Sequence, residues 1–239
     1  MRQVPHYLLI GNGRLARHFQ HYFSLLNLSF VTWNRKAPLD QLFAHLKHTT
    51  HILLLISDQA IEAFIFQYLQ NTQAKLIHCS GSLVSQHAYG AHPLMTFNQT
   101  LYDLKHYSAL PFIVDQEAPD FKDLLPGLPN KFFKIPAALK PKYHALCVLS
   151  GNFSCLLWTK LFSSFEKEFN FPAEIAFPYL LQQTQNLITD YKNSLTGPLV
   201  RNDVETLTRN INALSNDEFQ TIFKSFVNSY QKIKAEIDS

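Results

Sequence analysis

The feature that most constrains the fold is a strand–turn–helix pattern near the start of the 239-residue sequence. The apolar run 6–10 ends at Gly11 and Gly13, and apolar side chains at helical spacing follow it over residues 15–23. Gly11 permits a sharp turn, Gly13 lets the backbone approach a pyrophosphate, and Ala16 allows close helix–strand packing. The first amides of such a helix favour a phosphate. The pattern therefore predicts a dinucleotide site formed by Gly11, Asn12, Gly13, Arg14, Leu15 and Ala16.

The end of the second expected strand, residues 28–33, indicates which dinucleotide binds. Sites that prefer NAD usually carry an Asp or Glu about 20 residues after the glycines, where it binds the ribose 2′-hydroxyl. Here Trp33 and Asn34 occupy that position, and Arg35 and Lys36 follow directly. Because a guanidinium suits a 2′-phosphate in charge and donor geometry, we predict NADP(H), with Asn34 and Arg35 in the site. A solvated strand end without this role, or a flavin-type or deazaflavin cofactor on the same fold, stays open as an alternative.

Strands and helices alternate up to about residue 136. We expect strands at 6–10, 28–33, 51–56, 74–78, 109–114 and 132–135, with helices at 14–23, 39–47 and 59–69. Continuously apolar strands such as 51–56 are typical of parallel sheets that are covered on both faces. The fold class is therefore α/β, a Rossmann-type doubly wound parallel sheet with ligands at the carboxyl ends of its strands.

The remainder of the chain is expected to be helical. An amphipathic helix begins at Lys142, a second helix covers about 172–193, Asn202–Asp203 caps a third, and Ser215–Glu218 is a capping box for a fourth. We predict a dinucleotide-binding domain over residues 1–138 and an all-helical substrate or dimerisation domain over 139–239. A single fused domain is the alternative.

Composition narrows the function classes. The net charge is only +3 and basic residues are scattered, so we expect no nucleic-acid partner. No apolar run approaches the ~20 residues of a membrane span, so no membrane partner is expected. Three cysteines without framework spacing fit a cytoplasmic protein, and Cys147 and Cys155 are expected to be small core residues. The spacing of the histidines predicts no metal site.

Several strings occur in the order found in a known group of proteins. They are 11–16, Ile56–Ile61, His78–Leu83, His92–Phe97, Tyr143–Ala145, Ser150–Asn152 and Thr196–Asp203. With them the chain resembles bacterial Rossmann-like proteins that carry a C-terminal domain of unknown function, relatives of pyrroline-carboxylate reductases, ketopantoate reductases and β-hydroxyacid dehydrogenases. Ser57 stands where these relatives commonly have proline, Gly151 lies inside their usual Ser–Asn pair, and Asn202 replaces a common glycine. The resemblance implies the architecture and the cofactor more than a reaction.

Polar residues at the ends of two expected strands are candidates for the site. Ser57 and Asp58 should lie near the ribose or nicotinamide of the cofactor. Ser80, in the turn after the next strand, offers a hydroxyl for a substrate carbonyl or carboxylate, although an ordinary connection explains this turn equally well. His92 is the most natural general acid because histidine titrates near neutrality. A hydrogen bond within its loop is the alternative role.

The first long helix adds two candidates. In related dehydrogenases this helix places a polar residue at the substrate, so Asn152 is expected to polarise a C=O or C=N group. His144, eight residues earlier, would share the same helix face. Each could instead be a satisfied polar group between the domains. Arg201 could bind a substrate carboxylate, Asp203 or a neighbouring subunit.

These observations favour an NADP(H)-dependent oxidoreductase that acts on a small carbonyl, imine or hydroxy-acid substrate, and we expect a homodimer. The substrate would lie between Ser80, His92 and the helix that carries Asn152. Two readings without turnover stay open: a dinucleotide-binding sensor or scaffold, and a homodimeric interaction module with an unoccupied Rossmann fold.

Overall fold

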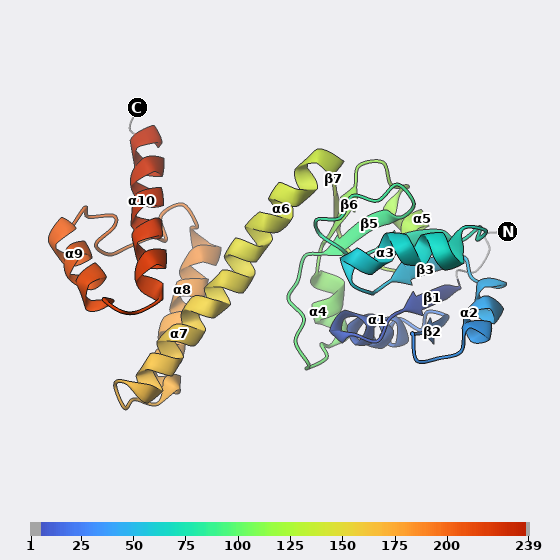
Figure 1. Ribbon diagram of the computed structural model, residues 1–239, viewed down its shortest axis with the longest axis horizontal. Coiled ribbons are helices and arrows are strands. Elements are labelled where there is room, and N and C mark those ends of the chain that lie inside the picture. Colours follow the sequence, from blue (N-terminus) through green and yellow to red (C-terminus); the bar gives the residue numbers. More distant parts are fainter. Residues whose placement is uncertain (1–5, 238–239) are drawn as a thin grey trace. The chain divides into compact units, whose positions relative to one another are not determined.

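The computed structural model describes residues 6–237 and divides the chain into two compact units between Leu157 and Trp158. Within the described residues, seven strands form one sheet in the first unit (Figure 1), in the order β2-β1-β3-β4-β5-β6-β7. The strands are β1 Tyr7–Ile10, β2 Phe30–Trp33, β3 His51–Leu54, β4 Lys75–His78, β5 Tyr89–Pro93, β6 Phe112–Asp115 and β7 Phe132–Ile135.

The sheet is doubly wound and mostly parallel, which confirms the predicted fold class. Strands β1 to β5 pair in parallel, β6 runs antiparallel to β5, and β7 is parallel to β6. After β2 the chain crosses to the other side of β1, so the strand order reverses between β1 and β3. In open α/β sheets, ligands bind beside the carboxyl ends of the strands at such a reversal. The glycine turn follows β1 at this edge.

Helices cover both faces of the sheet because its strands are apolar on both faces. Along β1, Tyr7 and Leu9 join one core with Phe19 and Phe23, whereas Leu8 and Ile10 join the core on the other face. The first face carries α1 Arg14–Leu25, α4 Leu104–Ala109 and α5 Phe121–Leu124. The second carries α2 Leu39–Leu46 and α3 Asp58–Phe64, which continues into a π-helical turn, η1 Ile65–Leu69.

The sheet region departs from the prediction at one strand that matters for the site. The short strand β5, with the sequence YGAHP, was not predicted, because Gly90 and Pro93 interrupt the apolar alternation. It carries His92, which the sequence placed in a loop. The expected strand at 109–114 is β6, shifted towards Asp115, and the short helices α4 and α5 were also missed.

A single long helix, Ala137–Lys167, follows the last strand. It consists of a 3-10 turn η2 Ala137–Leu139, α6 Lys140–Cys147, a π-helical turn η3 Val148–Phe153 and α7 Ser154–Lys167. It starts earlier than predicted and runs across the division between the two units, so the boundary at 138/139 stays a prediction. Among the described residues, this 31-residue helix alone is long and apolar enough to cross a membrane by length and composition, with a mean hydropathy of 1.4 over an 18-residue window. From the sequence we had predicted no apolar run long enough to span a membrane.

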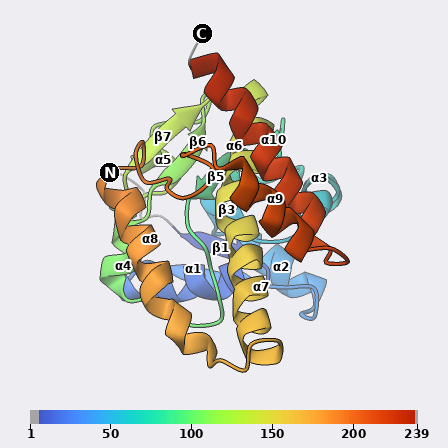
Figure 2. The same cartoon turned by 90° about the vertical axis from the view of Figure 1, so that its left-hand side faces the viewer.

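All regular elements of the second unit are helices within its described residues. It contains the end of α7, η4 Ala173–Ala176, α8 Phe177–Thr189, α9 Val204–Ala213 and α10 Phe219–Ile237 (Figure 2). Aromatic pairs join α7 to α8, with ring centroids 5.4 Å apart for Trp158 and Tyr179. Asp203 caps α9 as predicted and accepts from the Thr206 amide at 3.0 Å. At α10 the cap moves from the predicted Ser215 to Asp217, which accepts from the Phe219 amide at 2.8 Å.

Candidate functional site

The turn after β1 has the geometry of an anion site. Gly11 has φ +136°, and a Cβ there would overlap the carbonyl oxygen of Leu55 at the end of β3. Gly13 is the N-cap of α1, and no described atom lies within 4 Å of a Cβ built on it. The first turn of α1 has neither a side-chain cap nor an acidic residue. Its amide groups and helix dipole are therefore open to a phosphate, and this space fits the pyrophosphate of a dinucleotide.

The end of β2 presents a cation and no carboxylate. Trp33 is buried, and its indole N–H donates to the Pro38 carbonyl at 3.1 Å. The Asn34 side chain accepts from the Lys36 amide at 3.1 Å, which closes a tight turn and leaves the neighbouring Arg35 exposed. This local geometry is compatible with the predicted contact between Arg35 and a 2′-phosphate.

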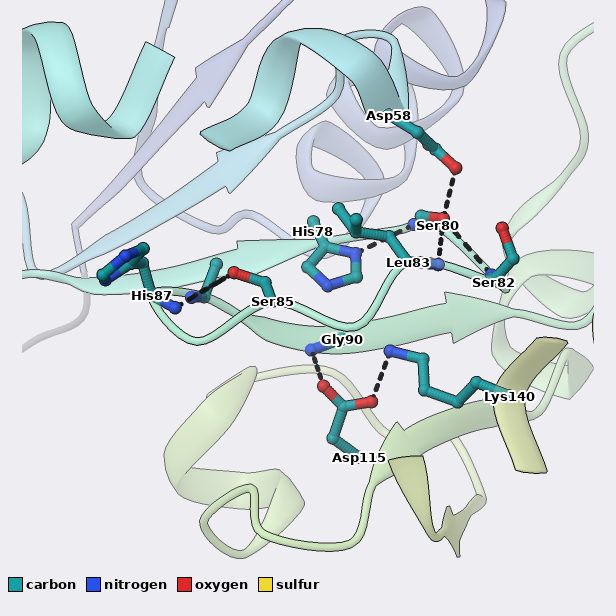
Figure 3. Close-up of polar contacts among 11 residues, drawn as sticks. Asp58, His78, Ser80, Ser82, Leu83, Ser85, His87, Gly90, Asp115 and Lys140 are labelled. Atoms are coloured by element: carbon teal, nitrogen blue, oxygen red, sulfur yellow. Dashed lines mark hydrogen bonds and ion pairs between the residues drawn. The ribbon is translucent and has the colours of Figure 1, made fainter. Parts of the chain in front are cut away.

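Ser80 is engaged inside its own turn (Figure 3). Its hydroxyl donates to Asp58 Oδ2 at 2.5 Å and accepts from the amides of Leu83 at 3.0 Å and Ser82 at 3.3 Å. The residue is only 9% exposed. These contacts link the start of α3 to the turn after β4, so Ser80 and Asp58 hold the edge of the sheet together. Ser57 and Asp58 are exposed at the amino end of α3, close to the strand reversal.

A cavity of about 1060 Å³ lies beside the glycine turn, within the first unit. It is lined by Arg14 and Leu15 from the turn, by His92 and residues 94–97, and by one face of the long helix. The predicted residues His92, His144 and Asn152 meet here, whereas Ser80, Ser57, Asp58, Asn34 and Arg35 lie outside the lining. Cys147 and Cys155 also line the cavity, so the expectation that they are core residues is wrong.

The π-helical turn η3 explains how Asn152 and His144 reach the same cavity. The resemblance implies that Gly151 is inserted into a Ser–Asn pair, and Gly151 lies within η3. A π-helical turn takes one more residue than an α-helical turn. The π-helical turn accommodates Gly151, and Asn152 lines the cavity together with His144.

His92 lines the cavity and is held in a cluster of rings. Its Nδ1 lies 2.8 Å from the Tyr143 hydroxyl, and its ring meets that of His144 edge-to-face at 5.8 Å. Gly81 lies against both histidines, since a Cβ there would be 2.5 Å from His144 Cδ2 and 3.2 Å from His92 Cδ2. A side chain at position 81 would therefore displace the two histidine rings, whereas glycine leaves room for both.

Burial makes His92 a neutral imidazole. Desolvation, helped by the nearby His144 and Lys140, lowers the pKa of His92 to about 4, against a weaker opposing effect of Asp58. Burial and the neighbouring Cys147 raise the pKa of the Tyr143 hydroxyl. At neutral pH both groups are therefore uncharged, and they share one hydrogen bond.

A buried ion pair, missed from the sequence, fixes the start of α6 (Figure 3). Lys140 Nζ lies 2.5 Å from Asp115 Oδ1, and Asp115 Oδ2 accepts from the Gly90 amide at 2.5 Å. The Lys140 side chain is only 4% exposed, and a Cβ on Gly90 would lie 2.5 Å from its Nζ. This clamp joins α6 to β5 and β6 one turn before Tyr143. No local sequence pattern predicts this ion pair, because Lys140 and Asp115 are 25 residues apart in the sequence.

Comparison with known families identifies the C-terminal part of the chain. Residues 114–230 match the family model described as a domain of unknown function, DUF2520. The match covers just under half of the chain. This match confirms the resemblance to Rossmann-like proteins with a C-terminal domain of unknown function. No curated protein matches the sequence.

Solved structures share the fold at low sequence identity. A protein of Bacteroides fragilis, whose name assigns it provisionally to the NADP oxidoreductases, is 17% identical with a TM-score of 0.75, over 95% of this chain and 98% of that one. Protein TM1727 of Thermotoga maritima is 19% identical with a TM-score of 0.66, over 98% and 100%. A reductive aminase of Aspergillus terreus, solved with NADPH and ethyl levulinate, is 14% identical with a TM-score of 0.61, over 98% and 95%. The chain thus has the fold of Rossmann-like oxidoreductases.

Proposed function

We propose that this protein is an NADP(H)-dependent oxidoreductase that acts on a small carbonyl, imine or hydroxy-acid compound. The observation that carries the proposal is the open amino end of α1, which adjoins a cavity walled by His92, Tyr143 and Asn152. The fold shared with a reductive aminase solved in complex with NADPH supports it. The three cysteines without framework spacing support a cytoplasmic location.

The binding roles follow from the two strand ends. The amides of Gly13, Arg14 and Leu15 would hold the pyrophosphate, and Arg35 the 2′-phosphate. Ser57 and Asp58, at the amino end of α3, would meet the nicotinamide ribose. When bound, the reduced nicotinamide supplies a hydride. No contact of the protein is needed for that chemistry beyond orientation and a proton source.

The cavity supplies orientation and shields the reacting atoms. Leu94, Met95 and Phe97 form an apolar wall that limits water around a small substrate. The Asn152 amide can donate to a carbonyl oxygen or an imine nitrogen, and His144 lies on the same face of the helix. The arrangement therefore suits an uncharged C=O or C=N group held between apolar side chains.

Thermal melting with nicotinamide dinucleotides tests the proposal. We expect millimolar NADPH to raise the Tm more than NADH does, because a ligand that binds only the folded state stabilises it. Arg35→Ala should weaken NADPH binding about tenfold or more and leave NADH binding nearly unchanged, since a charge-assisted contact contributes about 1.5–3 kcal/mol.

The matched control is Arg209→Ala, which removes an exposed arginine paired with Glu205 in the second unit. It should keep the full preference for NADPH. No Tm shift with either dinucleotide would overturn the proposal. Binding without consumption of NADPH in the presence of ketones or cyclic imines would favour a sensor or scaffold.

A further inference from the structure

We propose that the hydroxyl of Tyr143 delivers the proton to the substrate, with His92 as the residue that positions it. This inference rests on the proposed reductase function and assigns its proton donor. The sequence reading had given that role to His92 and had not singled out Tyr143.

The position of Tyr143 is fixed from several sides. It lies in α6 one turn after Lys140, whose buried ion pair with Asp115 anchors the helix. Its Oη lies 2.8 Å from His92 Nδ1 on β5, with the two rings near perpendicular at 77°. Tyr143 also lines the cavity that Arg14 and Leu15 of the glycine turn border. A rigid phenol is thus presented to the space next to the dinucleotide site.

The neighbouring polar groups are less suited to donate. His92 is neutral, because burial and the adjacent His144 and Lys140 disfavour its protonated form. The Ser80 hydroxyl already donates to Asp58, and the Asn152 side chain is an amide rather than an acid. With the proton of His92 on Nδ1, the imidazole donates to Tyr143 Oη, and the phenolic O–H is left to donate to the neighbouring Cys147 thiol or to a substrate in the cavity that both residues line.

In the proposed step, a carbonyl substrate gains one hydride and one proton. The carbonyl carbon receives a hydride, with its electron pair, from the reduced nicotinamide dinucleotide, and the C–O π bond breaks. The electron pair of that bond moves to oxygen, which takes the Tyr143 proton as the phenolic O–H bond breaks. The resulting phenolate accepts the Nδ1–H hydrogen bond of His92 and regains a proton from solvent. An imine nitrogen takes the proton in the same way.

The decisive variant is Tyr143→Phe, which removes one oxygen and keeps the ring. We expect kcat for NADPH oxidation with cyclohexanone or pyrroline to fall about 100-fold or more, since positioned acids contribute about 10²–10⁴-fold. The Tm shift caused by NADPH should stay unchanged. Tyr68→Phe, on η1 and outside the cavity lining, is the matched control and should keep full activity.

A second readout does not depend on turnover. In ¹⁵N-histidine NMR spectra, Tyr143→Phe should shift the His92 Nδ1 resonance, because the ring loses the hydrogen bond to Oη, and Tyr68→Phe should not.

His92→Gln, whose amide can still donate to Oη, should lose less activity than Tyr143→Phe.

Several results would overturn the inference. If Tyr143→Phe turns over at the wild-type rate, or if His92→Gln loses more activity than Tyr143→Phe, Tyr143 is not the donor while the reductase function stands. An unchanged His92 resonance in Tyr143→Phe would remove the positioning role. If the wild-type protein neither binds NADPH nor consumes it with either probe, the proposed function fails and this inference falls with it.

Discussion

At the scale of single residues, the buried histidines couple the stability of the fold to pH. His78, the last residue of β4, is fully buried, and its Nδ1 accepts from the Ser80 amide at 3.2 Å. Desolvation and the charge of Lys140 lower the pKa of His78 to about 4, although Asp115, Asp58 and Glu62 act in the opposite direction. The imidazole is therefore neutral in the folded protein at any pH well above 4.

The sign of the pH effect follows from that shift. Unfolded histidine titrates near its ordinary pKa of about 6.5, so between about 4 and 6.5 the unfolded chain binds a proton that the folded chain does not. The contribution of His78 is complete above pH 6.5 and declines as the pH falls towards about 4. It amounts to about 3 kcal/mol over that window. His92 acts in the same direction.

Urea unfolding at pH 4.5 and pH 7 measures this dependence in matched variants. We expect His78→Leu to lose less of its unfolding free energy than the wild type between these two pH values. The exposed His48→Asn variant should follow the wild type. Parallel pH dependences in His78→Leu and the wild type would show that His78 does not carry the effect.

At the scale of elements, the Lys140–Asp115 pair is the joint between the sheet and the long helix. Removing one member of a buried ion pair leaves an uncompensated charge and costs about 3–5 kcal/mol. Lys140→Met should therefore lower the unfolding free energy by about that amount. An additional Asp115→Asn substitution should restore part of it, because the leftover carboxylate is removed.

The control for this cycle is Arg209→Ala, which breaks an exposed helix pair with Glu205. Exposed pairs contribute about 0–1 kcal/mol, so little change is expected there. Should Lys140→Met cost no more than this control in urea unfolding, the pair does not anchor α6.

Comparison of the expected and observed elements shows which features can be predicted locally. The glycine turn, α1 and the first four strands of the chain were predictable, because the φ of Gly11 and the apolar periodicity depend on nearby residues. Strand β5 and the cluster of His92 and Tyr143 were not, since both depend on partners distant in the sequence. The hydrogen bond of His92 reaches 51 residues along the chain. The hydrogen bond between Ser80 and Asp58 could not be predicted either, because the two residues are 22 positions apart in the sequence.

At the scale of the whole molecule, the helices beyond the sheet expose large apolar side chains. On α8, Leu181 is 69% exposed, Ile188 75% and Tyr179 65%, and on α7 Leu156 is 50% exposed. Contiguous apolar surface on a protein is typical of an interaction site. The sequence reading expected a homodimer, and we propose a second copy of this chain as the partner that covers α7 and α8.

Light scattering coupled to size exclusion tests that partner, with an expected mass of twice 27.5 kDa. The double variant Leu181→Glu/Ile188→Glu should be monomeric, because a stable interface buries about 800 Å² per partner and does not tolerate two unpaired charges at its centre. Gln183→Glu adds one charge on the same helix and should remain dimeric. A monomeric wild type at micromolar concentration would contradict the proposal. Recovery of the protein only with detergent would instead point to a membrane surface as the partner of the long helix.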